Sequence, residues 1–384
     1  MLVHSKLFRV PGGRLVPLLA ALLPLSASGP AASRVTDDEG VWVTWQKKKF
    51  HTSEPTSSID EWAAKAAREW AGFAKANDYE LFLADDQRVL LVISGKKRSD
   101  ELALIEKTCE FLDETIRPPA EKPRVKAIPA GADPAQANDG DPLGVVTMVL
   151  VRVEDEEDMT ALVNYCTELR PHLRAWSVLG SSTAFYQQSP LCAAWLEMPE
   201  GLVEDEWQTE NELVHRLTHL IRLREYGVQP NWLAMGLAWY VEEELLSSIY
   251  CMPNRETLVE KKEHKAWERD LRKLYKKHED PVRIEDLTEL AAGTWDKEAA
   301  LRAWGAVRYL AQYRPEALPL VLADLRMLWE TKGVESSANG SWRRLPGFEV
   351  SNEDQLAVLK KHAGPEVMAE MGRFFEKGRT FRPK

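Results

Sequence analysis

The stretch 212-ELVHRLTHLIRLREYGVQPNWLAMGLAWYVEEE-244 decides the fold of this chain, because it predicts two neighbouring helices of different character. The first helix is expected over 210–226, since Thr209 and Glu212 form a capping box and Gly227 is a typical stop. The second is expected over 231–250. It is apolar on all sides as far as residue 246 and is therefore predicted to be buried beside the first.

His215 and His219 stand out in the first helix. At about 100° per residue, the apolar side chains fall in one sector and the two histidines point nearly the opposite way. They are therefore expected to face solvent or a cleft, where a spacing of four lets both imidazoles reach one ion. An HxxxH pair alone is common and is more often two unrelated histidines than a metal site.

The two segments together are more specific than the histidines. The chain reads 215-HRLTH-219 and then 230-PNWLAMGLAWY-240. This resembles the gluzincin metallopeptidases, especially the peptidase MA-like proteins of unknown function, whose pattern is HExxH followed by P-x-W-L-x-E-G-L-A-x-Y. The resemblance implies an α+β, zincin-like fold, with a mixed sheet, helices, an active-site-type helix and a mostly α-helical C-terminal part. It covers about two thirds of the chain, but only the central motif is sharp.

Two carboxylates of that pattern are missing. The resemblance places Arg216 at the general base and Met235 at the third zinc ligand, and a guanidinium cannot accept a proton at any working pH. A thioether is a poor zinc ligand beside imidazoles. Trp239 stands where the family often has a group that orients a histidine. Glu242 lies about 10 Å further along the helix than Met235 and is predicted to belong to a solvated helix end.

The N-terminus predicts export. Lys6, Arg9 and Arg14 precede the apolar run 15-LVPLLAALLPL-25, which is followed by small residues. This is the layout of a signal peptide over 1–28, and the run is shorter than the roughly 20 residues of a membrane span. Removal of three cations changes the formal net charge from -10 to -13. A secreted, periplasmic or cell-envelope protein is expected, with no integral membrane segment after signal removal. Because the mature protein is acidic, it is not expected to attract nucleic acid or anionic lipid through a general basic field.

The rest of the chain divides into three parts: an N-terminal segment with a helix over 29–77, a zincin-like α/β domain over 78–250, and a helical domain over 251–384. The Pro- and Gly-rich stretch 118–144 is predicted to be an insertion in the second part. Basic runs in the third part alternate with acids and indicate solvated helix faces. Further elements are expected as a helix over 61–76, two strands within 80–94, helices over 99–116 and 155–170, strands over 145–153 and within 184–197, and helices over 256–278, 284–291, 296–313, 315–331 and 352–377.

The four cysteines are widely spaced and contain no CxxC motif. Export permits disulfides, but spacing cannot choose a pairing, and buried free thiols are an equally good interpretation. The cysteines are Cys109, Cys166, Cys192 and Cys251.

Three functions are compatible with these patterns. The first is an exported, catalytically inactive metallopeptidase homologue without a cofactor that binds a peptide, protein or envelope component. The second is an active zinc metallopeptidase with rearranged ligands, and the third is a purely structural domain whose cleft is filled. Under the first reading, His215 and His219 are remnants of a metal site. The candidates to line the former cleft are Arg216, Met235, Trp239 and Glu242.

Overall fold

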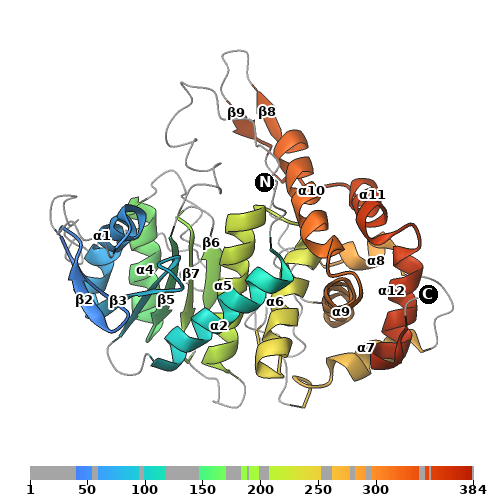
Figure 1. The fold of residues 1–384 in the computed structure, drawn as a ribbon, viewed down its shortest axis with the longest axis horizontal. Helices are drawn as coiled ribbons and strands as arrows, with labels where there is room; N and C mark the ends of the chain where they lie inside the picture. Colours follow the sequence, from blue (N-terminus) through green and yellow to red (C-terminus); the bar gives the residue numbers. More distant parts are fainter. Residues whose placement is uncertain are drawn as a thin grey trace, which may run out of the picture.

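The computed structural model places a mixed β-sheet beside a large helical region (Figure 1). The predicted signal peptide and the insertion at 118–144 lie outside the described residues. The structure describes residues 40–53, 59–94, 99–117, 147–169, 183–187, 190–198, 207–251, 262–276, 282–290, 296–336, 342–345 and 347–382.

Seven strands form the sheet, in the order β2-β1-β3-β4-β5-β7-β6. The β4, β5 and β7 strands are parallel to one another, and β3 and β6 flank them in antiparallel pairs. The predicted strand pair within 80–94 is confirmed as β3 and β4. The strands are β1 Trp42–Trp45, β2 Lys48–His51, β3 Tyr79–Ala84, β4 Val89–Ser94, β5 Met148–Val153, β6 Ala184–Gln187 and β7 Cys192–Leu196.

The central strands are buried on both faces, because successive side chains in a strand point to opposite sides. In β4, Leu91 belongs to one hydrophobic cluster, whereas Leu90 and Val92 belong to a second cluster on the other face. The second cluster also contains buried residues of α1 (Glu61–Ala76) and α4 (Glu156–Leu169). A sheet covered on both faces explains why these strands are continuous apolar runs rather than alternating ones.

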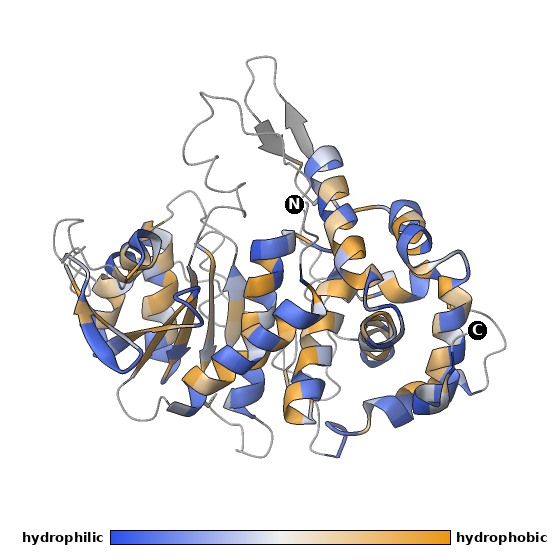
Figure 2. Ribbon diagram, viewed as in Figure 1, coloured by the Kyte–Doolittle hydropathy of each residue, from blue (hydrophilic) through white to orange (hydrophobic). Residues whose placement is uncertain are grey.

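The first cluster continues without a break into the helical region. Figure 2 shows hydrophobic residues along α6, between the sheet side and the C-terminal helices. The helices of this region are α2 Ser99–Thr115, α5 Thr209–Tyr226, α6 Asn231–Leu246, α7 Trp267–Tyr275, α8 Ile284–Thr288, α9 Lys297–Tyr313, α10 Ala317–Lys332, α11 Asn352–Ala363, α12 Val367–Lys377 and the short η3 Gly378–Thr380. A two-stranded hairpin, β8 Val334–Ser336 with β9 Trp342–Arg344, follows α10.

Several predicted helices are shorter or divided in the structure. The helices predicted over 231–250 and 284–291 end at Leu246 and Thr288. Residues 262–265 form turns, so α7 begins only at Trp267 rather than within a helix over 256–278. The helix predicted over 352–377 is two helices, α11 and α12. It breaks at Gly364, which has a φ of +100°, because this left-handed backbone and the following Pro365 cannot continue a helix.

Close contact between α6 and α9 fixes the helical region beside the site. A Cβ placed on Gly236 would lie 2.5 Å from the carbonyl oxygen of Ala303 in α9. Only glycine permits this approach of the two backbones. Among the described residues, no helix combines the length and apolar character needed to cross a bilayer.

Candidate functional site: a buried histidine–glutamate network

The histidine helix α5 ends as predicted but does not begin as predicted. Gly227 closes it with a φ of 61° and donates its backbone N–H to the Leu223 carbonyl. At the start, Gln208 is the N-cap and makes no side-chain capping bond. Thr209 instead accepts a hydrogen bond from Trp195 Nε1 of β7 at 3.0 Å. The predicted capping box is therefore wrong, because tertiary contact takes the hydroxyl that would have capped the helix.

Both histidines are completely buried, with 0% exposure. The prediction that they face solvent or a cleft is wrong, although they do lie away from the apolar face of α5. The side of α5 that carries the histidines is also covered. The α6 helix lies along it, and Tyr186 of β6 stacks on His219 with ring centroids 3.9 Å apart. A helix in the middle of a fold has no solvent face, so its polar stripe has to be satisfied inside the protein.

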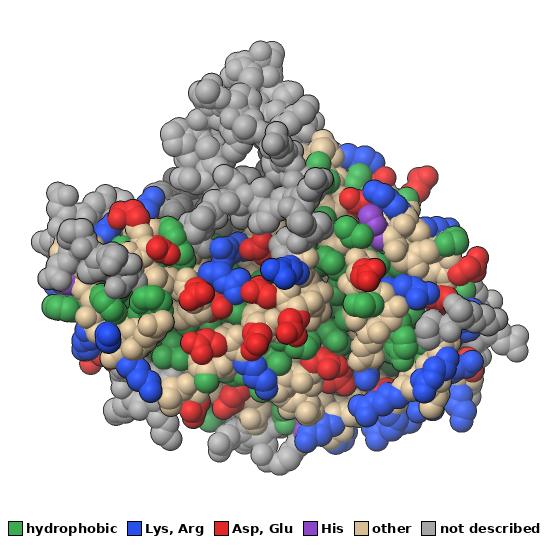
Figure 3. Space-filling model, viewed as in Figure 1, with side chains coloured by type: hydrophobic (Ala, Val, Ile, Leu, Met, Phe, Trp, Pro, Cys, Tyr) green, Lys and Arg blue, Asp and Glu red, His purple; other side chains and the backbone are tan. Residues whose placement is uncertain are grey.

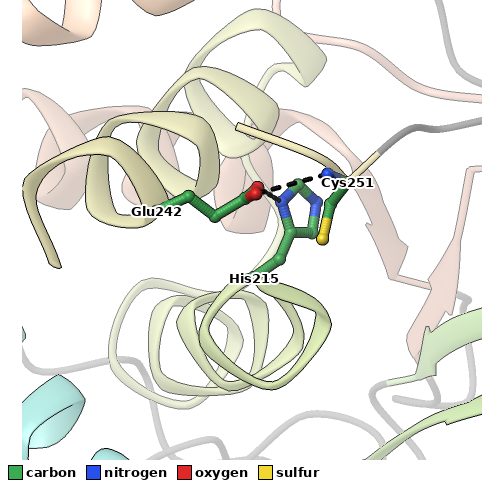
Figure 4. A group of neighbouring side chains, drawn as sticks. All are labelled: His215, Glu242 and Cys251. Atoms are coloured by element: carbon green, nitrogen blue, oxygen red, sulfur yellow. Dashed lines mark hydrogen bonds and ion pairs between the residues drawn. The ribbon is translucent and has the colours of Figure 1, made fainter. Parts of the chain in front are cut away.

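A chain of short contacts joins the two imidazoles to a carboxylate. His215 Nδ1 lies 2.6 Å from Glu242 Oε1, and His215 Nε2 lies 3.1 Å from His219 Nε2. Figure 4 shows the Glu242 side chain reaching from α6 to the near nitrogen of the imidazole. Each distance suits a hydrogen bond, so one hydrogen occupies each contact. The far end of the chain, His219 Nδ1, has no hydrogen-bond partner among the described residues.

Glu242 is fully buried, and three N–H groups donate to its second oxygen. Asn211 Nδ2 lies 2.8 Å from Oε2, and the backbone nitrogens of Tyr250 and Cys251 lie at 3.1 and 3.2 Å. The interpretation of Glu242 as part of a solvated helix end is therefore wrong. The physical reason is the short loop between the helices: α6 returns along α5, so a residue further along α6 reaches a residue nearer the start of α5.

The position of the expected general base holds an internal ion pair. Arg216 is 5% exposed, and its Nε donates to Glu212 Oε2 one helical turn earlier at 2.8 Å. No unpaired carboxylate is thus held at this position to accept a proton.

Met235 and Trp239 belong to the hydrophobic core rather than to an open surface. Trp239 has no exposed area, and its Nε1 donates to the carbonyl oxygen of Cys251 at 2.9 Å. This bond holds the segment after α6 against the helix. All four residues predicted to line a cleft, Arg216, Met235, Trp239 and Glu242, are buried.

Burial controls the ionisation of the network. It lowers the pKa of His215 well below its usual range, and the Arg216 charge adds to this effect. The pKa of His219 is lowered well below its usual range by burial, with further contributions from His215 and the two arginines. Burial raises the pKa of Glu242 to about 8, against the lowering effect of its three donors. Both imidazoles are therefore uncharged at neutral pH.

The sequence did not predict that Cys251 lies beside the histidines, because this cysteine belongs to no recognised metal-binding motif. His215, Glu242 and Cys251 each offer one ligand atom within 4.8 Å of the others (Figure 4). Burial raises the pKa of the Cys251 thiol well above its usual range, and the Glu212 and Glu242 charges act in the same direction. The sulfur is therefore a thiol, whereas metal ions bind thiolate.

Only part of this arrangement fits zinc. Two imidazole nitrogens on one zinc ion lie about 3.3 Å apart for tetrahedral bonds of 2.0–2.1 Å, close to the 3.1 Å between the Nε2 atoms. Glu242 is hydrogen-bonded to the opposite nitrogen of His215, where carboxylates orient metal-binding histidines. It is therefore placed as an orienting group and not as the missing third ligand.

All four cysteines are free and buried, and this agrees with the interpretation as buried thiols rather than disulfides. No protein-family model matches the chain, and no curated protein matches its sequence.

Proposed function

We propose that this chain is a non-hydrolytic protein with a gluzincin-like fold, in which the histidine pair stabilises the core. Because the four residues expected to line the former cleft are buried, the proposed binding function uses another surface. The observation that carries the proposal is the Arg216–Glu212 ion pair at the position of the general base. Hydrolysis of a peptide by zinc-bound water needs a carboxylate there to take the proton. A guanidinium whose charge is matched by its own glutamate does not perform this step.

The described fold supports the gluzincin-like part of the proposal at a coarse level. A mixed sheet lies beside a helix that carries the histidines, and a buried helix follows directly after it. The proposed ligand is a peptide, a protein or a cell-envelope component, in line with the export that residues 1–28 predict.

The test combines metal content with peptidase activity. Purified protein is supplied with zinc, dialysed and assayed for bound metal and for cleavage of an unstructured protein such as casein. We expect less than about 0.1 zinc per chain and no cleavage that a chelator suppresses. One zinc per chain with chelator-sensitive cleavage, lost in His215→Gln, would refute the proposal.

The His215–Glu242–Cys251 cluster favours a second candidate, a buried zinc site that is structural rather than catalytic. In it, the histidines would supply the nitrogen donors, Glu242 would orient His215, and Cys251 would supply sulfur after losing its proton. This candidate predicts about one bound zinc per chain without peptidase activity, and weaker retention in Cys251→Ser. Zinc content unaffected by Cys251→Ser would exclude the sulfur ligand.

A further inference from the structure

Seven exposed cations gather at the outer side of the C-terminal region. Figure 3 shows lysine and arginine side chains along the lower right edge of the molecule, where Figure 1 places α7 and α12. We call this surface the basic face. It consists of Arg269, Arg272, Lys273, Lys276, Lys377, Arg379 and Arg382.

The packing of α7 against α12 brings these residues together from two distant parts of the chain. Tyr275 of α7 contacts Phe375 of α12 with ring centroids 5.0 Å apart. At the adjacent turn, a Cβ on Gly378 would lie 3.0 Å from the Arg272 side chain. Because the apolar sides of both helices are buried against each other, their charged sides share one surface.

The cations of the basic face outnumber the acids that could neutralise them. Arg379 pairs with Glu268 at 3.1 Å, and Arg269 and Lys273 share Asp270 at 3.3 and 3.5 Å. Asp270 is about one fifth and Glu268 about one quarter exposed, and a third acid, Glu376 of α12, is exposed beside Lys377. Seven cations against these three acids leave the surface basic, in a chain with a net charge of -10.

Arg272, Lys276 and Lys377 are exposed and make no ion pair within the described part of the chain. Three long cations without a local partner are available to an external anion. Among the described residues, the large apolar side chains with high exposure are Trp42, Met198 and Leu320, and all three lie outside the basic face. Attraction by the basic face would therefore be electrostatic, with no apolar insertion.

We propose that the basic face docks this protein on a membrane surface rich in anionic phospholipid. Clusters of four to eight lysines and arginines bind such headgroups, and each cation near the membrane strengthens the attraction by a similar increment. A surface formed by two helices offers several cations to several headgroups at once. The proposal concerns a surface away from the histidine network and does not depend on the proposed function.

Vesicle co-sedimentation tests the proposal with the full chain. Vesicles of phosphatidylcholine alone are compared with vesicles that contain about 40% phosphatidylglycerol, at low and at high salt. We expect binding to the anionic vesicles only, and its loss at about 0.5 M salt. Binding to neutral vesicles, or no binding to either, would overturn the proposal.

Charge reversal locates the surface. The variant Arg272→Glu with Lys276→Glu and Lys377→Glu is compared with a control triple that makes the same change in net charge. The control is Lys47→Glu in the β1–β2 turn with Lys48→Glu and Lys49→Glu at the start of β2, where all three lysines are exposed. We expect the first variant to lose affinity at least about 10-fold and the second to lose less than about 3-fold. Equal losses would contradict a localised face. The glutamine versions of both triples serve as a second pair should a reversal variant not fold.

A soluble polyanion separates a membrane surface from other anions. Inorganic polyphosphate is titrated against the wild-type protein under the same conditions. Retention of polyphosphate together with no binding to the anionic vesicles would reject the membrane and leave a general polyanion site.

Discussion

Glu242 Oε1 on α6 lies 2.6 Å from His215 Nδ1 on α5, and neither side chain has exposed area. The resemblance to gluzincins placed Trp239 where a group that orients a histidine is expected, so the sequence predicted that this group is missing. In the structure Glu242, three residues further along α6, makes the hydrogen bond to His215 instead. The same carboxylate holds the backbone after α6 through its second oxygen.

Replacement of Glu242 by alanine is expected to destabilise the fold strongly. It would remove the acceptor of two backbone N–H groups and of one Asn211 N–H, and the hydrogen-bond partner of His215 Nδ1, so we expect a loss of about 3–5 kcal/mol in the free energy of unfolding. Glu242→Gln keeps an acceptor oxygen for the N–H donors and an N–H donor for His215 Nδ1. It should cost about 1 kcal/mol at pH 6. Urea denaturation measures both, and a loss below about 1 kcal/mol in Glu242→Ala would show that the network does not stabilise the fold.

Local patterns predicted most of the elements. The helix expected over 61–76 has those limits in the structure, and β5 lies within the apolar run predicted as a buried strand. Both predictions rest on periodicity and on residues at element ends, which depend only on neighbours in the sequence. Gly364 and Pro365 also mark a helix break by local sequence alone, so the single helix predicted over 352–377 is wrong for a local reason.

The site could not be predicted in the same way. Periodicity placed His215 and His219 opposite the apolar face of α5, but it cannot show that α6 and Tyr186 cover that side as well. The role of Glu242 depends on how α6 returns along α5, and Cys251 reaches the cluster through the backbone after α6. These are tertiary relationships between segments, and no spacing within one segment carries them.

Stability should depend on pH with a maximum near pH 6.5. The folded histidines have lowered pKa values, whereas unfolded histidines titrate near pH 6.5. Below this pH the unfolded chain binds more protons, so the free energy of unfolding falls as the pH falls. The pKa of Glu242 is raised to about 8 from 4.5 by burial. Between these values the folded chain binds the extra proton, so stability falls as the pH rises.

Below pH 6.5 the destabilising protonation of the two unfolded histidines exceeds the stabilising protonation of folded Glu242. Above pH 6.5 only the Glu242 contribution to the pH dependence remains. Urea denaturation from pH 5 to pH 9 measures the profile. Glu242→Gln should flatten the decline above pH 6.5 and keep the decline on the acid side. A wild-type profile that rises steadily to pH 9 would contradict the raised pKa of Glu242.

Arg216 and Glu212 should be strongly coupled. Arg216→Met leaves a buried carboxylate without its cation, and Glu212→Gln leaves a buried guanidinium without its anion, so each should cost about 3 kcal/mol or more. The double variant should cost less than the sum, since neither uncompensated charge remains. The pair of the same spacing, Arg302 with Glu298 at 3.3 Å, is the control: Glu298 is 62% exposed, and Arg302 keeps Glu289 as a second partner at 2.6 Å. It should show a coupling of about 0.5 kcal/mol. Similar coupling in both pairs would argue against an internal ion pair at the position of the base.

The four thiols should react only after unfolding. All are buried as free cysteines, and burial raises the pKa of Cys109 and Cys251 well above the usual range. Thiolate is the reactive form, so native protein should not react with a thiol reagent over minutes, whereas denatured protein without reductant should titrate four thiols. Two thiols in the denatured, unreduced protein would instead indicate a disulfide.

Gly236→Ala should loosen the support of the site without changing any polar group. Its Cβ would lie 2.5 Å from the Ala303 carbonyl oxygen and 2.9 Å from a methyl group of Val307, so α6 would have to move away from α9. The backbone of α9 cannot move aside as a flexible side chain can. Overpacking of this kind lowers the free energy of unfolding by about 1–3 kcal/mol. Gly347→Ala is the control: it has space around the added methyl group, and only its φ of +70° costs about 1 kcal/mol. Because α6 also carries Glu242, a movement of this helix should change the hydrogen bond from Glu242 to His215. NMR should therefore detect altered chemical shifts of the imidazole nitrogens in Gly236→Ala and wild-type chemical shifts in Gly347→Ala.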